Sequence, residues 1–449
     1  MSKKGIIAPL LVGALTAQLL AACGGGTKDD ATPAVGNNPV EEKRDPVELV
    51  VYFPYIADWS EEQFMEAFGN PLKKKYPHIT LKYIGGGPPG TKIPELLAAG
   101  VNIDIIYASI GATPPHLLDV ALEYDISGLI KQFNYDLTKL EPSMVDMIRK
   151  LGNGKIYGLP VYVPPSAVYY NKDIFDKFGV PYPKDGYTWD DMYEMNLKLT
   201  REENGVQYVG IGASYGHMTQ LNQLSLPLVN ENATQAVYAN DSRWAQWVEN
   251  FVRFYRVPGY EKYNAKLSEP NERNRFFKDR VVGMFMALTA LHQPTEVNDL
   301  NWDLTTYPTF KERPGVGPQP YPTYFYITNI SKHKEDAFMA ISFFASDEFQ
   351  MERSKEGRFL TTSANRAIRD VFGQDNPFYK GKNVKAFQPE KYADPPIIHK
   401  FNVKAGNDIG TAMAEVIRGQ KDINTALREA MEKTNKYIQE ELAKEAANK

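Results

Sequence analysis

The amino-acid sequence predicts an α/β protein with two lobes, each built on a doubly wound sheet. Strand and helix patterns alternate from residue 47 onward in the order β-α-β-α-β, which is typical of parallel sheets covered by helices. The same alternation returns after residue 188. The chain has 449 residues, and a single hydrophobic core seldom grows beyond roughly 250–300 residues, so two lobes are expected.

The elements of the first lobe follow from simple periodicities. Apolar residues alternate over 47–53 as they do in a strand. Ser60, with Gln63 three positions later, has the pattern of a capping box, which starts a helix. The next expected elements are a strand over 79–83, a short helix over 93–99 that ends at Gly100, and a buried strand over 103–107.

The second lobe shows the same signals. Thr188 and Asp191 form another capping pattern before an amphipathic helix. An aromatic stripe from Trp244 to Tyr255 has helical spacing, and we interpret it as core packing rather than as a sugar platform. The remaining expected elements are strands over 206–211 and 284–288 and long amphipathic helices over 334–352 and 409–445.

The first 46 residues have the pattern of an export signal and a tether. Lys3 and Lys4 precede an apolar run, which ends in the sequence Leu-Ala-Ala-Cys-Gly around Cys23. This segment resembles a bacterial lipoprotein signal, so we expect residues 1–22 to be removed and Cys23 to be acylated, for example with palmitate. Residues 24–46 have almost no apolar content, which predicts a disordered tether to a membrane.

Composition and motif spacing argue against several other classes of protein. The formal net charge is −4 and the basic residues do not form a strong patch, so no nucleic-acid partner is expected. The glycines at 85–90 are not followed by the Lys-Ser/Thr pair of a phosphate-binding loop. His, Cys and Asp residues do not have the spacing of metal ligands. The sequence therefore predicts no cofactor and no metal site.

Several stretches resemble one known family. They read GKIYGLP at 154–160, VYYNKDIF at 168–175, GVP at 179–181 and YTWDD at 187–191. A further stretch at 276–284 fits the same family, with Asp279 where glycine is usual. Together these stretches resemble the family 1 extracellular solute-binding proteins of ABC importers, the group that includes maltose-binding protein.

The resemblance implies a type II periplasmic-binding-protein fold with a ligand cleft between its lobes, which close by hinge bending. Lobe 1 is expected to comprise 47–162 plus 325–370, and lobe 2 to comprise 163–324 plus 371–449. The implied ligand is a carbohydrate, most simply an oligosaccharide, and the implied partners are the transmembrane subunits of an ABC permease. We expect a monomer anchored by lipid on the extracytoplasmic face of the cell membrane, with an envelope of the Gram-positive type.

The expected ligand contacts lie in loops that follow predicted strands. Aromatic rings can stack on sugar rings while a polar tip binds hydroxyl groups. The expected contacts are Tyr55, Asp58 and Trp59 after the first strand, Tyr107, Ser109 and Gly111 after the third, Tyr162 near the first crossover, Ser214, Tyr215 and His217 in the second lobe, His292 where the family often has a stacking tryptophan, and Tyr324 in the stretch 321–326.

Two alternatives to a transport receptor remain open at this point. The sequence GASYG at 212–216 fits the G-x-S-x-G pattern of an α/β-hydrolase, with Ser214 as the nucleophile of an esterase. Such an enzyme would need an acid such as Asp299 or Asp303, and a histidine such as His333 or His399. The strand before Ser214 is polar for the centre of a hydrolase sheet, so we expect no enzyme activity. The other alternative is a sensory receptor that serves no transporter.

Overall fold

The first sheet has six strands in the order β12-β4-β11-β3-β1-β2. The computed structural model describes residues 44–55, 59–263, 268–288 and 299–447. The expected signal segment and Cys23 lie outside these residues. The strands are β1 (Val47–Phe53), β2 (Ile79–Gly85), β3 (Ile105–Ser109), β4 (Gly158–Val163), β11 (Thr323–Ile327) and β12 (Leu360–Thr361).

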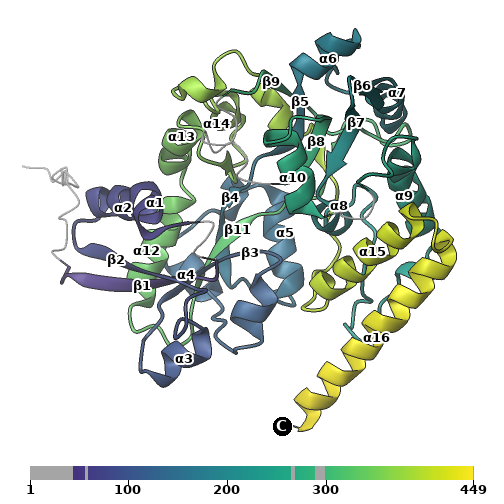
Figure 1. The fold of residues 1–449 in the computed structure, drawn as a ribbon. Coiled ribbons are helices and arrows are strands. Elements are labelled where there is room, and N and C mark those ends of the chain that lie inside the picture. Colours follow the sequence, from purple (N-terminus) through teal and green to yellow (C-terminus); the bar gives the residue numbers. More distant parts are fainter. Residues whose placement is uncertain (1–43, 56–58, 264–267, 289–298, 448–449) are drawn as a thin grey trace, which may run out of the picture. The chain divides into compact units, whose positions relative to one another are not determined.

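Pairing in this sheet confirms the opening β-α-β-α-β prediction. β1 pairs in parallel with both β2 and β3, so the carboxyl ends of these three strands share one edge of the sheet. β11 is antiparallel to β3 and β4, which makes the sheet mixed rather than purely parallel. Figure 1 shows β11 between these two strands, although it lies far beyond them in the sequence.

The second sheet has five strands in the order β6-β7-β8-β5-β9. They are β5 (Ser166–Asn171), β6 (Arg201–Glu203), β7 (Val206–Ala213), β8 (Val282–Leu288) and β9 (Trp302–Thr305). β7 and β8 are parallel, whereas β5 is antiparallel to its neighbours β8 and β9. A small parallel pair is formed by β10 (Val316–Gly317) and β13 (Lys391–Tyr392).

Helices connect the strands and cover the sheets. The α-helices are α1 (Glu61–Phe64), α2 (Asn70–Lys75), α3 (Ile93–Ala98), α4 (Ser127–Gln132), α5 (Pro142–Leu151), α6 (Lys172–Phe178), α7 (Trp189–Leu199), α8 (Tyr215–Gln220), α9 (Ser242–Val252), α10 (Glu269–Phe277), α12 (Lys334–Phe344), α13 (Asp347–Lys355), α14 (Arg366–Asp370), α15 (Asn402–Ile417) and α16 (Ile423–Ala447). Short 3₁₀ or π turns occupy Met65–Gly69, Pro114–Leu118, Leu137–Lys139, Tyr238–Asn240, Arg253–Arg256, Pro377–Tyr379 and Val384–Phe387.

Both predicted capping boxes are confirmed. The Ser60 hydroxyl accepts from the Gln63 amide at 3.2 Å, while the Gln63 side chain accepts from the Ser60 amide at 3.0 Å. Thr188 and Asp191 make the corresponding pair of bonds at the start of α7. Each box satisfies two backbone donors that the first helical turn leaves without a partner.

The two long helices expected near the end of the chain were wrong in extent. The stretch 334–352 is divided into α12 and α13, because Ser346 leaves the helical conformation and caps α13 by accepting from the Phe349 amide. The stretch 409–445 is divided into α15 and α16. Gly419, with a φ of 69°, ends the first of these helices.

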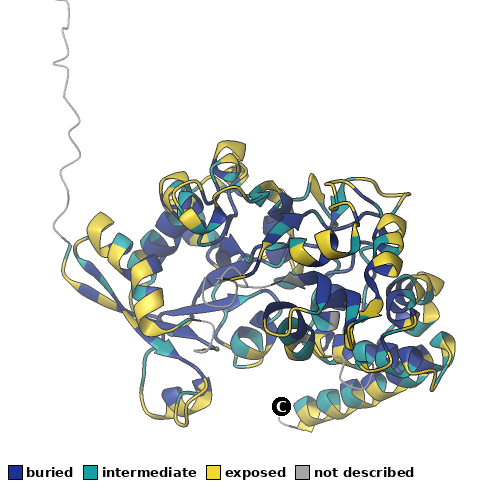
Figure 2. Ribbon diagram, turned by 45° about the horizontal axis from the view of Figure 1, so that its top comes forward, coloured by how far each residue is buried: buried dark blue, intermediate teal, exposed yellow. Residues whose placement is uncertain are grey.

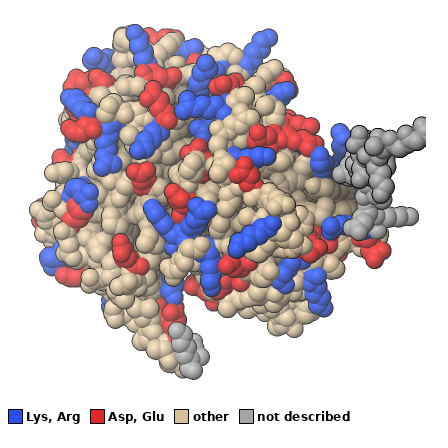
Figure 3. Space-filling model, turned by 180° about the vertical axis from the view of Figure 1, so that it is seen from behind, with Lys and Arg blue, Asp and Glu red and all other residues tan. Residues whose placement is uncertain are grey.

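Two clusters of buried hydrophobic side chains stabilise the sheets. One is formed by residues between 47 and 162 and between 324 and 359, and the other surrounds the second sheet. The aromatic stripe of α9 belongs to the second cluster, which confirms its interpretation as core. Figure 2 shows that the strands inside the molecule are largely buried, whereas exposed residues lie mainly on the outer helices and loops. Within the described residues, no helix is long and apolar enough to cross a membrane. Figure 3 shows acidic and basic side chains interspersed on one face.

Candidate functional site

Aromatic side chains gather where β1 and β3 of the first sheet end. Tyr107 lies in β3, with its ring centroid 4.7 Å from that of Phe53 at the end of β1 and 6.0 Å from that of Tyr162 in β4. Trp59 follows β1, and its indole nitrogen donates to the Tyr162 hydroxyl at 3.4 Å. The structure therefore brings three of the predicted contact residues, Trp59, Tyr107 and Tyr162, into one group.

The members of this group differ in their access to solvent. Tyr107 is fully buried and Tyr162 is 9% exposed, so both form the rear of the group. Trp59 is partly exposed, and Tyr55 is 45% exposed. The front of the site therefore consists of Tyr55 and Trp59, which can offer ring surface to a ligand.

His116 is a neighbour of Tyr55 that the sequence did not single out. Its ring lies edge-on to the Tyr55 ring at 5.7 Å, and its Nε2 atom is 3.5 Å from the Tyr55 hydroxyl. Burial lowers the pKa of His116 below the ordinary value, so the neutral imidazole is favoured. A neutral imidazole can both donate and accept hydrogen bonds, which suits the recognition of hydroxyl groups.

Ser214 and His217 form a second group at the end of β7. Ser214 Oγ lies 2.7 Å from His217 Nδ1, and burial lowers the pKa of this histidine. The ring of Tyr321 lies 6.3 Å from the His217 ring. The Tyr321 hydroxyl also accepts from Ser109 at the end of β3, at 3.4 Å. Tyr321 thus connects predicted contacts that follow strands of different sheets.

Gly111 gives Tyr321 the space that this contact needs. A Cβ atom at residue 111 would lie 2.4 Å from the Tyr321 hydroxyl oxygen, which is closer than van der Waals contact permits. The sequence placed both residues near the cleft but favoured Tyr324 over Tyr321. The close approach of glycine and tyrosine joins residues far apart in the chain, so no local sequence signal could have found it.

Tyr324 is placed apart from these residues. Its side chain is fully buried, and its hydroxyl donates to the Met144 carbonyl at 2.7 Å. Its ring stacks on that of Tyr326, two positions along β11 and on the same face of the strand. In this conformation Tyr324 is part of the core. Asp58, His292 and the side chain of Tyr215 lie outside the described residues.

Ser214 is not paired with Asp303, one of the acids expected for a hydrolase. Its sheet has the order β6-β7-β8-β5-β9, so Asp303 in β9 is separated from the end of β7 by two strands. The Asp303 carboxylate instead accepts from the Asn383 amide at 2.8 Å. Within the described part of the chain, His217 has no hydrogen bond to a carboxylate, and Ser214 is only 2% exposed. The described residues also contain no cluster of three His, Cys, Asp or Glu side chains that could hold a metal ion.

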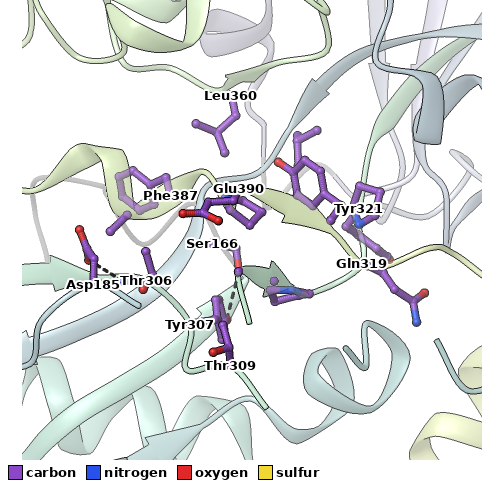
Figure 4. A pocket seen from close by; sticks show the side chains of 18 of the residues that line it. Ser166, Asp185, Thr306, Tyr307, Thr309, Gln319, Tyr321, Leu360, Phe387 and Glu390 are labelled. Atoms are coloured by element: carbon purple, nitrogen blue, oxygen red, sulfur yellow. Dashed lines mark hydrogen bonds between the residues drawn. The ribbon is translucent and has the colours of Figure 1, made fainter. Parts of the chain in front are cut away.

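A separate cavity of about 200 Å³ lies where the two sheets are connected. Its walls come from the β4–β5 connection, from the segment between β9 and β11, and from residues 386–392 (Figure 4). An edge strand of each sheet flanks this region. In the first sheet it is β12, at the opposite edge from β2, and in the second sheet it is β9, at the opposite edge from β6. None of the predicted contact residues lines the cavity, although Tyr321 does.

Comparisons with known proteins agree with this architecture. Residues 57–351 match the family described as bacterial extracellular solute-binding protein. Proteins of Brucella abortus and Brucella suis that are named as binding proteins are 24% identical to the chain over 256 residues. That match covers 52% of this chain and 56% of each relative, so the chain spans about half the length of the curated relatives it matches.

Solved structures show the same fold at low sequence identity. An ABC substrate-binding protein of Listeria monocytogenes, in complex with cycloalternan, is 18% identical, with a TM-score of 0.67 over 88% of this chain and 99% of that chain. A sugar transporter of Rhizobium etli in an open conformation has a TM-score of 0.68 at 20% identity, over 86% and 99% of the two chains. The sugar-binding protein MalE of Xanthomonas citri has a TM-score of 0.65 at 16% identity, over 88% and 98%.

The family match covers more than half of the 449 residues. The structural similarity of this chain to solved binding proteins extends over both sheets. The predicted two-lobed periplasmic-binding-protein fold is therefore confirmed. The chain belongs to the family of bacterial extracellular solute-binding proteins.

Proposed function

We propose that this protein captures a carbohydrate, most simply an oligosaccharide, outside the cytoplasm and delivers it to the permease of an ABC importer. The observation that carries the proposal is the pairing of exposed aromatic rings with polar side chains at strand ends of both sheets. Tyr55 and Trp59 offer ring surface, while Ser109, His217 and Tyr321 offer hydroxyl and imidazole groups. Stacking surfaces beside hydrogen-bonding groups are what a sugar ring requires.

The ligands bound in similar structures support the carbohydrate class. Those proteins are bound to cycloalternan, α-D-tagatose, D-mannitol and mannotriose. These ligands range from single sugars to oligosaccharides, so they favour the class without fixing its length. The neutral histidines of the site agree with this choice, because an uncharged polyol needs donors and acceptors rather than a charged partner.

Binding by lobe closure is part of the proposal. The proposed lobes are 47–162 plus 325–370 and 163–324 plus 371–449, each with its own sheet. A ligand held by Tyr55 and Trp59 on one lobe and by His217 on the other would favour the closed arrangement, because it gains contacts only there. The protein would act as a monomer without catalysis, and a permease would recognise the closed form.

A lipid anchor completes the proposed function. Acylation of Cys23 would hold the receptor beside its permease and raise its effective concentration there. A Cys23→Ser variant should appear in the soluble rather than the membrane fraction, with unchanged affinity for the sugar. Fractionation of cells that express both forms tests this, and a Cys23→Ser protein that stays with the membrane would contradict it. Such an anchor suits a Gram-positive envelope.

A thermal-shift screen tests the ligand class. Because a ligand that binds only the folded state stabilises it, a sugar at about 100 times its Kd should add about 2.7 kcal/mol to the free energy of unfolding. The panel contains mono- and oligosaccharides, with peptides and nucleosides as controls. A rise in Tm with one or more sugars is expected. Shifts caused only by peptides or nucleosides would contradict the carbohydrate class.

The same purified chain can be tested for enzyme activity. A chromogenic ester should not be hydrolysed above background, and Ser214→Ala should not alter that background. Hydrolysis by the wild type that is lost in Ser214→Ala would overturn the receptor proposal.

A further inference from the structure

The cavity between the connections of the two sheets has a charge pattern of its own. Its lining includes two carboxylates, Asp185 and Glu390, and contains no lysine, arginine or histidine. Within the described residues, neither carboxylate has an ion-pair partner within 4.0 Å. Both side chains are exposed, which places them at the rim of the cavity. The rim therefore attracts cations and repels anions.

The Asp185 carboxylate is held in place by neutral donors. Its Oδ1 atom accepts from the Thr306 amide at 3.0 Å and from the Thr305 hydroxyl at 3.3 Å, and its Oδ2 atom accepts from Asn383 Nδ2 at 2.8 Å. These bonds orient the carboxylate while leaving its negative charge uncompensated. A preorganised carboxylate loses little conformational entropy when a cation binds.

Glu390 is positioned by a glycine. Gly315 has a φ of 72°, and a Cβ atom at that residue would lie 2.5 Å from Glu390 Oε2. Only a glycine lets the carboxylate pack this closely on the backbone. Figure 4 shows Asp185 and Phe387 toward one end of the cavity and Gln319 and Tyr321 toward the other, with Glu390 between them.

The inner wall is aromatic and aliphatic. Four aromatic rings line it, those of Tyr307, Tyr321, Phe387 and Tyr392, together with Val163, Leu360 and several prolines. The Tyr307 hydroxyl accepts from Ser166 at 3.1 Å, which fixes the ring against the β4–β5 connection. Aromatic faces attract ammonium groups through the ring quadrupole, and such rings form the cages that recognise alkylated ammonium ions.

We propose that this cavity is a second binding site, which takes a small organic ammonium ion with an apolar body. Asp185 and Glu390 attract the charged group at the rim, and the aromatic wall accepts the apolar part. The volume of about 200 Å³ fits a compact ligand of this kind. The site is separate from the strand-end residues proposed for the sugar, apart from the shared Tyr321, so each proposal can fail without the other.

The test compares a cation with its neutral isostere on the purified full chain. Binding of phenethylammonium and of 2-phenylethanol is measured by isothermal titration calorimetry and by saturation-transfer NMR, without any sugar present. The two probes share the same apolar body and differ in charge. We expect the cation to bind about tenfold more tightly, because its contacts with the two carboxylates at the rim add to the apolar contacts that both probes make.

The variants separate the pocket from general electrostatics. In the Asp185→Asn/Glu390→Gln double variant the preference for the cation should fall to about onefold, while binding of the alcohol is retained. Glu312→Gln removes an exposed carboxylate from the same segment outside the cavity lining, and should leave the preference unchanged. The proposal would be overturned if the wild type bound both probes equally or bound neither saturably. It would also be overturned if Glu312→Gln lost as much of the preference for the cation as the double variant does.

Discussion

Two groups of aromatic side chains in this protein illustrate how position determines role. Trp244 and Trp247 of α9 are 0% and 3% exposed, and the Trp247 ring stacks on Phe251 at 5.5 Å. Trp59, which follows β1, is only partly buried. One indole N–H in each group is satisfied within the protein, since Trp244 donates to the Pro227 carbonyl and Trp59 donates to Tyr162.

The difference between them lies in what surrounds each ring. The α9 stripe packs against α15 and α16 and belongs to the second buried cluster, so its rings are covered by the core. The strand-end group has a buried rear in Tyr107 and Tyr162 and an exposed front in Tyr55 and Trp59. Aromatic composition alone therefore does not indicate a binding site, whereas an exposed aromatic residue just after a buried parallel strand lies where α/β folds bind ligands.

The largest expected effect is on stability, at Trp244. Trp244→Ala removes a fully buried indole and leaves a cavity, so the free energy of unfolding should fall by about 3–5 kcal/mol. Urea unfolding followed by circular dichroism measures this. The Kd of the folded fraction for the sugar should not change. A loss of affinity in Trp244→Ala would mean that the α9 stripe takes part in binding.

The converse is expected at Trp59. Trp59→Ala should weaken sugar binding by about tenfold, roughly 1.4 kcal/mol, because a stacking surface at the front of the site is lost. The free energy of unfolding should fall by less than it does in Trp244→Ala, since Trp59 is only partly buried. Trp59→Phe keeps a ring and serves as the control. Equal affinity in wild type and Trp59→Ala, measured by calorimetry, would exclude Trp59 from the site.

A smaller effect is expected at Gly111. Gly111→Ala places a methyl group 2.4 Å from the Tyr321 hydroxyl oxygen, so Tyr321 must move away from Ser109. Sugar affinity should fall by about threefold to fivefold, the loss of roughly one hydrogen bond. Gly128→Ala is the matched control, because nothing lies within 4 Å of a Cβ atom there. If the two variants bind the sugar equally well, Tyr321 has no role in binding.

The smallest expected effect is a pH dependence that comes from His217. Burial lowers its pKa in the folded protein below the ordinary value of 6.5. As pH drops through about 6.5, His217 takes up a proton in the unfolded chain but stays neutral in the folded protein. The free energy of unfolding therefore falls over this range. His217→Gln should lose less stability than wild type between about pH 8 and about pH 5.5, measured by urea unfolding. Identical pH profiles would show that His217 is not held neutral.

The sequence predicted best those features that depend on residues close together in the chain. The capping boxes at Ser60 and Thr188 and the alternation over 47–53 depend on residues close together in the chain, and the structure confirms them. The break at Ser346 was missed because an apolar pattern that continues on both sides hides a local cap.

The relations between distant residues could not be predicted in the same way. The sequence favoured Tyr324 as a contact, whereas the structure places Tyr324 in the core and Tyr321 beside Ser109. Which residues of 321–326 face the core depends on the register of β11 against β3 and β4, and the sequence alone does not give this register. The bond from Ser109 to Tyr321 and the contact of His116 with Tyr55 each join separate segments. The carboxylate rim of Asp185 and Glu390 likewise exists only once the chain has folded.

Calorimetric titration of the purified chain with a panel of di- and trisaccharides tests the central claim most directly. At least one sugar should bind saturably with a Kd of about 10 μM or tighter, and Trp59→Ala should weaken that binding by about tenfold while Trp244→Ala leaves it unchanged. The account would be contradicted if no sugar bound, or if Trp59→Ala bound the sugar as tightly as the wild type.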